Sequence, residues 1–248
     1  MMRTDHFDES TVEQAAKEWL AEIGFHTGYA PVDAAPKDVR DSLSECILWK
    51  HVTDALTRLN PGADPDLIRS AVARIQRAES QDVMTENQRL YELMVRGVPV
   101  ETTGDDGRPS TVRLRLVDFD SPENNDWRAL NQFTIIEAGH NRRPDMLIFL
   151  NGLPVGLLEL KNSADINAKL RRAWNQIQTY RSEIPSVFIP NVVTVISDGT
   201  SAAMSSFTGG FEHYAPWKTI DGRDVITNRP ALEVLLKGVF DPHRFLDI

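Results

Sequence analysis

Cysteine is nearly absent from the sequence, and long apolar runs are missing altogether. The single Cys46 excludes an internal disulfide and is typical of a protein kept in a reducing cytoplasm. No apolar run approaches the roughly 20 residues that a membrane-spanning helix needs, and the opening residues, MMRTDHFDES, are acidic, unlike a secretion signal. We therefore expect a cytoplasmic protein without a membrane association.

Motifs for nucleotide hydrolysis and for covalent catalysis are also missing. The sequence has no GxxxxGK[ST] phosphate loop, so no ATP site is expected within these residues. It has no GxSxG, and its six histidines show no spacing typical of zinc ligands. A reaction carried out by this chain must therefore rely on carboxylates, amines or a hard metal ion.

The charge of the chain is unevenly distributed. The net charge of -9 argues against a general nucleic-acid coat protein. Positions 141 to 182, however, contain seven Lys or Arg residues and only three Asp or Glu residues. Such a basic island can bind phosphate groups, although Lys169, Arg171 and Arg172 are equally explained as the solvated side of a helix.

Patterning predicts a mixed α/β fold (mixed α+β), with a central mixed sheet flanked by helices. Capping residues and apolar periodicity indicate mostly helices over 1–96, and alternating or continuous apolar runs indicate strands from 97 onward. The expected helices are 9–23, 41–59, 65–78, 85–96, 164–181 and 231–237. The expected strands are 98–103, 111–119, 131–138, 146–150, 154–160 and 191–197.

The stretch from 142 to 180 contains two of these strands, joined at Asn151-Gly152, a strong hairpin signal. Side chains alternate along a strand, so Glu159 and Lys161 share a face. A strict two-residue loop would place Asp145 opposite Leu158 and turn Glu159 away. We therefore predict a three-residue or bulged connection, which sets Asp145, Glu159 and Lys161 on one face.

Two carboxylates held side by side on apolar strands repel each other and lose hydration, so they need a cation. Oxygen ligands without cysteine or clustered histidine favour magnesium or manganese over zinc. Such an ion can activate a water and neutralise charge on a phosphodiester, while Lys161 orients that water or stabilises charge. Taken alone, the short pattern of Asp145, Glu159 and Lys161 favours a surface ion pair instead.

The following helix carries Gln176 and Tyr180, which are four residues apart and therefore share a face, with Arg172 one turn earlier. A core tyrosine and a surface glutamine are the default interpretation of this pair.

Longer strings in the sequence resemble the N-terminal nuclease region of the R (motor) subunit of type I restriction-modification enzymes, within the PD-(D/E)xK nuclease superfamily. Pro144-Asp145 and Glu159-Leu160-Lys161 match the superfamily motif, and Gln176 with Tyr180 matches the QxxxY element of one branch. The strings that carry the resemblance are RLNP at 58–61, GVPV at 97–100, NQF at 131–133, 142–162, NQIQTY at 175–180, 189–202 and WK at 217–218.

The resemblance implies a metal-dependent DNA endonuclease with the fold expected above. Asp145, Glu159 and the carbonyl of Leu160 would bind Mg²⁺, with Mn²⁺ as a substitute, and Lys161 would assist the attacking water. An acidic residue of the first helix would join the metal site, with Glu13 as the preferred candidate and Glu9 as the second. Gln176 and Tyr180 would steady the site or the DNA strand, and the DNA-binding residues would be Arg142, Arg143, Lys169 and Arg172.

The resemblance also implies an arrangement of domains and partners. Residues 1–222 would form the nuclease domain, with a helical part at 1–96 and a catalytic core at 97–222. Residues 223–248 would lead to a helicase region that uses ATP. Double-stranded DNA and the modification and specificity subunits would be the partners. Two alternatives are a docking module without catalysis and a stand-alone repair or defence nuclease.

Overall fold

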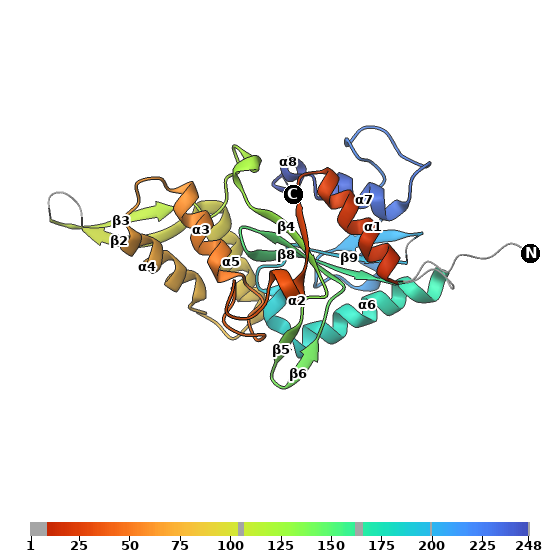
Figure 1. The fold of residues 1–248 in the computed structure, drawn as a ribbon, viewed down its shortest axis with the longest axis horizontal. Helices are drawn as coiled ribbons and strands as arrows, with labels where there is room; N and C mark the ends of the chain where they lie inside the picture. Colours follow the sequence, from red (N-terminus) through yellow and green to blue (C-terminus); the bar gives the residue numbers. More distant parts are fainter. Residues whose placement is uncertain (1–8, 104–106, 162–165, 199, 248) are drawn as a thin grey trace, which may run out of the picture.

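The computed structural model describes residues 9–103, 107–161, 166–198 and 200–247, and its centre is a six-stranded mixed sheet (Figure 1). The strands lie in the order β1-β4-β7-β8-β9-β10. The pairs β1–β4 and β8–β9 are parallel, and the other neighbours are antiparallel. The strands are β1 (His26–Tyr29), β4 (Trp127–Asn131), β7 (Met146–Leu150), β8 (Leu153–Leu160), β9 (Val193–Ser197) and β10 (Ala202–Ser205).

Helices and two small hairpins surround this sheet. The α-helices are α1 (Glu9–Glu22), α2 (Ala30–Asp33), α3 (Trp49–Leu59), α4 (Pro65–Gln76), α5 (Val83–Arg96), α6 (Ile166–Glu183), α7 (Ala231–Val239) and α8 (Pro242–Phe245). Short 3-10 turns are η1 (Pro122–Asn124), η2 (Pro185–Phe188) and η3 (Phe211–His213). The hairpins pair β2 (Val98–Thr103) with β3 (Pro109–Leu114), and β5 (Ile135–Glu137) with β6 (His140–Arg142). The mixed α/β class predicted from the sequence is thereby confirmed.

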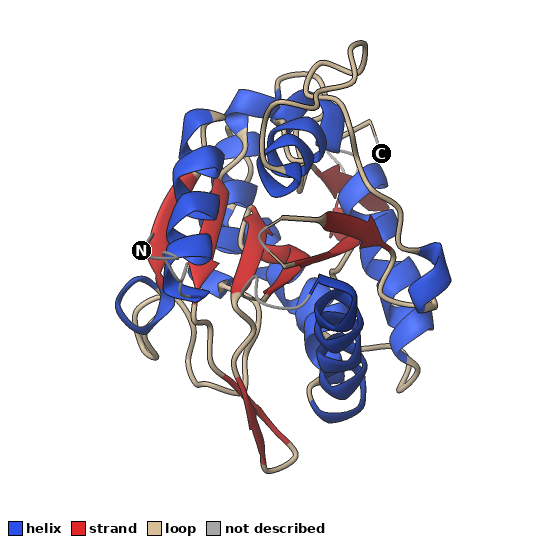
Figure 2. Cartoon of the chain, turned by 90° about the vertical axis from the view of Figure 1, so that its right-hand side faces the viewer, coloured by secondary structure: helices blue, strands red, loops and turns tan. Residues whose placement is uncertain are grey.

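Both faces of the central sheet are covered by helices (Figures 1 and 2). On one face, Ala16 of α1 and Leu235 of α7 belong to the same buried cluster as Leu158 of β8. On the other face, Ile177 of α6 belongs to a second cluster with Leu147 of β7. The residues of β7 alternate between the two clusters, as the pleat requires. Among the described residues, no helix combines the length and the apolar character needed to cross a membrane.

The hairpin of β7 and β8 is the centre of the sheet, and every residue of both strands is buried. Its loop is Asn151-Gly152 alone, because Leu150 pairs with Leu153, and both loop residues have positive φ values of 50° and 86°. This is the conformation that favours Asn-Gly. A bulge then leaves Val155 without a partner, so that Met146 pairs with Leu158. The predicted bulge is confirmed, and the alternative of a three-residue loop is wrong.

The helix predicted at 41–59 is wrong over its first eight residues, because α3 begins at Trp49. Residues 41–48 instead bond to distant main chain: Ile136 donates its amide to Leu43, and Leu48 donates its amide to Gly152. The buried Arg40 guanidinium also donates to the carbonyls of Ala34, Glu45 and Thr134. These long-range bonds outweigh the local helical propensity.

Two predicted strands also have different bounds. The strand expected over 131–138 is interrupted at Gln132, which has a φ of 59°, so β4 ends at Asn131 and β5 begins at Ile135. The strand expected over 111–119 ends at Leu114. Both differences reflect backbone turns that the apolar pattern does not reveal.

Candidate active site

The three charged residues at the open end of the central hairpin, Asp145, Glu159 and Lys161, lie close together. Extending the register from Met146 and Leu158 places Asp145 opposite Glu159. The Lys161 Nζ lies 2.6 Å from Oε1 of Glu159 and 3.7 Å from Oδ2 of Asp145. The same Asp145 oxygen accepts a hydrogen bond of 2.7 Å from the amide of Leu160. Both carboxylates thus share one face and one ammonium group, and the bulge at Val155 makes this possible.

Glu159 is the most unusual titratable group of this site. Its residue is 1% exposed, and burial, followed by the negative charge of Asp145, raises the pKa of its carboxyl to about 8. The ammonium of Lys161 and the hydroxyl of Tyr180 oppose this shift. A carboxyl with a pKa of about 8 keeps its proton near neutral pH. It releases that proton when a further positive charge binds beside it.

Helix α6 covers the site with the two residues that its spacing predicts to share a face. The Tyr180 hydroxyl donates to Oε2 of Glu159 at 3.1 Å and lies 3.5 Å from the carbonyl oxygen of Arg143. Burial, followed by the charges of Glu159 and Asp145, raises the pKa of Tyr180, so the hydroxyl stays protonated as a donor. The Gln176 side chain hydrogen-bonds Tyr180 in turn. Tyr180, with Gln176 behind it, therefore contacts the site through Glu159.

Glu13 of α1 is buried close to the strand ends but does not contact the other carboxylates directly. Its two carboxylate oxygens accept bonds of 2.8 Å from Asn131 Nδ2 and 2.7 Å from Gln132 Nε2. Gln132 also donates its main-chain amide to the carbonyl of Asp145 at 3.1 Å. Helix α1 packs on the opposite face of the sheet from Tyr180. Glu13 is therefore linked to the site through Gln132.

The predicted DNA-binding residues differ in their surroundings. Arg142 pairs with Glu183 of α6, which raises the pKa of Arg142. Arg143 and Arg172 are exposed to solvent. Lys169 belongs to α6, but its side chain lies outside the described residues, as does that of Glu9 in α1.

The donor set suits a hard cation that keeps several waters. Among the described residues, no group of three or more His, Cys, Asp and Glu side chains is placed to hold a metal. The set is instead the two carboxylates of Asp145 and Glu159 with the backbone of Leu160 between them. Magnesium is commonly held by one or two carboxylates with the remaining positions filled by water or phosphate. In this structure the Lys161 ammonium provides the positive charge between the two carboxylates.

Three polar residues beside the site were not predicted from the sequence. Asn131 and Gln132 hold Glu13, and only the NQF string, matched to the family without a role, pointed to them. Asp198 follows β9, whose Ser197 accepts the Lys161 amide. One Asp198 oxygen accepts two loop amides, and the other is buried without a hydrogen-bond partner among the described residues. No local pattern distinguishes these residues from ordinary strand ends.

Comparison with known proteins identifies the family of this chain. Residues 6–213 match the family described as type I restriction enzyme R protein N terminus. The type I restriction enzyme HindI endonuclease subunit of Haemophilus influenzae is 33% identical over 247 aligned residues, covering 97% of this chain and 23% of that protein. The putative type I restriction enzyme MjaIXP endonuclease subunit of Methanocaldococcus jannaschii is 26% identical, covering 97% and 24% respectively.

The chain therefore spans about a quarter of the length of these curated relatives. The family match extends from the start of α1 across the central sheet to the end of η3. It includes both strands of the hairpin that carries Asp145, Glu159 and Lys161, and the helix that carries Tyr180. On this match, the chain belongs to the family of type I restriction enzyme R protein N-terminal regions.

Proposed function

We propose that this chain is a magnesium-dependent DNA endonuclease domain that hydrolyses phosphodiester bonds. The observation that supports this most directly is the pairing of Asp145 with the buried Glu159 around the Lys161 ammonium. A surface ion pair would leave its carboxylates hydrated, whereas Glu159 is 1% exposed. Burying two acids beside each other is costly unless a strong cation binds them.

The chemistry divides between the ion and the side chains. When bound, magnesium or manganese would neutralise charge on the scissile phosphate and lower the pKa of a coordinated water. Asp145 and Glu159 would hold that ion together with the Leu160 carbonyl. Lys161 would move from the two carboxylates to the attacking water or the phosphate oxygens. Tyr180, supported by Gln176, keeps one Glu159 oxygen fixed by donating a hydrogen bond.

We extend the proposal to the longer protein that the relatives suggest. Both relatives are named as endonuclease subunits of type I restriction enzymes and are about four times as long as this chain. A cytoplasmic complex with modification and specificity subunits, acting on double-stranded DNA, would then be the setting of this domain. ATP-driven translocation would belong to sequence beyond these residues.

Calorimetric titration with magnesium separates this proposal from a docking module that has lost catalysis. We expect heat of binding for the unmodified chain and none for Asp145→Asn, because the amide offers no negative charge to a hard cation. The control is Asp38→Asn, which removes a charge from an exposed site away from the strand ends. Equal binding heats for both variants would contradict the proposed site.

Removing the Tyr180 hydroxyl should weaken cleavage without abolishing it. Tyr180→Phe keeps the ring in its buried cluster and deletes the bond to Glu159, so we expect plasmid nicking to fall about tenfold, typical of a residue that orients a metal ligand. Gln176→Ala should have a smaller effect, since Gln176 acts on Glu159 through Tyr180. Nicking rates and thermal unfolding are measured on the same preparations. A complete loss of nicking accompanied by unfolding would indicate that Gln176 and Tyr180 have a purely structural role.

A further inference from the structure

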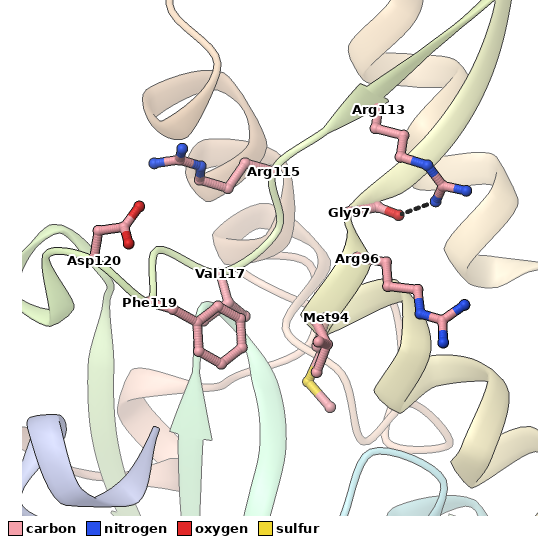
Figure 3. Close-up of a pocket in the computed structure, with 9 residues that line it drawn as sticks. Met94, Arg96, Gly97, Arg113, Arg115, Val117, Phe119 and Asp120 are labelled. Carbon is pink, nitrogen blue, oxygen red and sulfur yellow. Dashed lines mark hydrogen bonds between the residues drawn. The ribbon is translucent and has the colours of Figure 1, made fainter. Parts of the chain in front are cut away.

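A polar cleft separate from the carboxylate site lies next to the turn of the central hairpin, at the opposite end of the hairpin from the carboxylates. The cleft has a volume of about 290 Å³ and is walled by the end of α5, by β3 and by the loop after β3 (Figure 3). An apolar hollow that shares Phe119 and Val117 with it reaches Leu150 and Val155 of the hairpin. Its lining includes Arg96, Gly97, Arg113, Arg115, Phe119 and Asp120.

Three guanidinium groups line this cleft: that of Arg96 at the end of α5, and those of Arg113 and Arg115 at the end of β3 and directly after it. Arg113 and Arg115 alternate with the buried Leu114 and Leu116, so both are exposed on one side of the chain. Arg113 donates to the carbonyl oxygen of Gly97 at 3.3 Å, which places it beside Arg96 (Figure 3). Among the described residues, Arg89 and Arg115 form ion pairs, but neither Arg96 nor Arg113 does. Two such cations side by side attract an anion.

The acids nearby do not cancel this charge. Asp120 lines the cleft, and the buried Asp118 lies 3.3 Å from Arg115. A neighbouring hollow of about 220 Å³ is also lined by Arg96 and Arg113, together with two further arginines and two glutamates. Counted once, the two linings contain five arginines and three acids, in a chain whose net charge is -9. Three of these arginines pair with Glu79, Glu86 and Asp118, whereas Arg96 and Arg113 take no part in those ion pairs.

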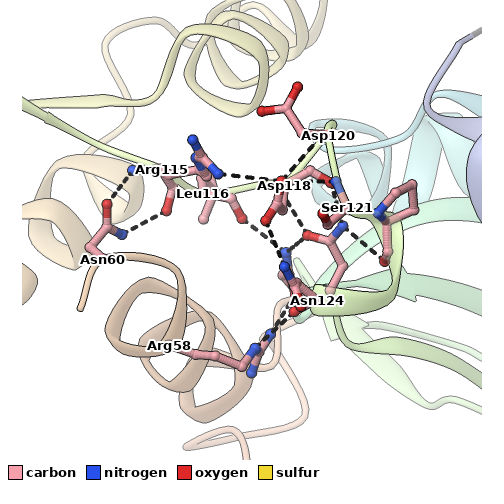
Figure 4. A network of polar contacts seen from close by, with 11 residues as sticks. Arg58, Asn60, Arg115, Leu116, Asp118, Asp120, Ser121 and Asn124 are labelled. Carbon is pink, nitrogen blue, oxygen red and sulfur yellow. Dashed lines mark hydrogen bonds and ion pairs between the residues drawn. The ribbon is translucent and has the colours of Figure 1, made fainter.

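A polar network holds one wall of the cleft in place (Figure 4). Asn60 bonds the main chain of Arg115 twice, at 2.9 Å to its carbonyl and 2.7 Å from its amide. Asp118 accepts bonds from the amides of Asp120 and Ser121, both at 3.2 Å. These bonds fix the loop that carries Phe119 before any ligand arrives, which lowers the entropic cost of binding.

The cleft also has an exposed aromatic wall. Phe119 is 40% exposed and lines both the cleft and the adjoining apolar hollow. Tyr91, which lines the adjoining hollow, is 50% exposed. Arginines beside exposed rings are typical of surfaces that hold the phosphates of a nucleic-acid strand and stack its bases. An acidic peptide would use the arginines alone.

We propose that this cleft is a second contact for DNA, in which Arg96 and Arg113 bind phosphodiester groups and Phe119 stacks on an unpaired base. Six residue steps of β8 separate Leu153, beside the turn, from Glu159, a distance of roughly 20 Å at about 3.3 Å per residue. That distance corresponds to about six nucleotide steps along a strand of a duplex. The inference rests on the proposed function for the identity of the nucleic acid as DNA.

The test measures binding without cleavage. Fluorescence anisotropy of a labelled single-stranded oligonucleotide is followed against the full chain carrying Asp145→Asn, in EDTA and at several salt concentrations. Adding Arg96→Ala and Arg113→Ala should weaken binding at least tenfold and reduce the slope of log affinity against log salt by about 1.4, the value for two phosphate contacts on a single strand. Phe119→Ala should weaken single-stranded binding more than double-stranded binding.

The matched control is Arg69→Ala with Arg223→Ala, which removes the same charge from exposed positions outside the cleft. Affinities equal to this control in the Arg96 and Arg113 variant would overturn the proposal. A mononucleotide that binds as tightly as the oligonucleotide would also overturn it, because a small phosphate ester would then be the ligand. Absence of oligonucleotide binding would overturn it in favour of a protein-docking surface. Since no cleavage is measured, failure of the nuclease proposal gives a separate result.

Discussion

Alanine in place of Lys161 is expected to lower DNA nicking about a thousandfold while leaving magnesium binding intact. The ammonium shares the two carboxylates with any incoming cation, at 2.6 Å from Glu159 and 3.7 Å from Asp145. Its removal takes away a positive charge that competes with the metal ion for both carboxylates, so metal affinity should rise or stay equal. The attacking water, however, would lose the ammonium that lies beside both carboxylates, which is the positive charge that the proposed mechanism uses besides the metal.

Nicking of supercoiled plasmid in magnesium and in manganese measures the rate, and calorimetry measures metal binding on the same preparations. Lys50→Ala is the control, since Lys50 forms an exposed pair with Asp54 on α3. Asp145→Ala and Glu159→Ala should lose both nicking and metal binding, because each removes a ligand. A Lys161→Ala variant that nicks at the unmodified rate would rule out the proposed role of the lysine.

The shared face of Asp145, Glu159 and Lys161 could be predicted because strand alternation depends only on how many residues separate them. One additional residue is required, and it can be placed either in the loop or in a bulge with the same effect on alternation. The sequence therefore predicted that the three side chains share a face, but not whether the extra residue lies in the loop or in a bulge. The structure places it at Val155, the third residue after the loop.

Contacts between distant segments could not be predicted in the same way. Gln132 adopts a left-handed backbone that non-glycine residues seldom adopt, and its side chain bonds Glu13 from 119 positions away. The cleft at Arg96 and Arg113 likewise arises from the packing of β3 against the end of α5, where Gly97 has a φ of 78°. A side chain at Gly97 would place its Cβ 2.9 Å from the carbonyl oxygen of Leu114, so this approach depends on glycine.

The metal-free chain is expected to lose stability as the pH rises from about 4.5 to about 8. The pKa of Glu159 is raised in the folded state to about 8 from an ordinary value of 4.5, chiefly by burial. Between these values the unfolded chain releases the Glu159 proton and the folded chain keeps it. The folded state then binds more protons, so the free energy of unfolding decreases with increasing pH.

Glu159→Gln isolates this contribution, because the amide has the shape of the protonated acid and does not titrate. Urea unfolding in EDTA should give similar free energies for both proteins near pH 4.5, and an advantage of a few kcal/mol for the variant at pH 8, on the order expected for a shift of this size. Magnesium at pH 8 should stabilise the unmodified chain more than the variant, since binding requires the ionised carboxylate and releases its proton. Unfolding free energies that change in parallel from pH 4.5 to 8 would show that Glu159 is ionised without metal, held by Lys161 and Tyr180 alone.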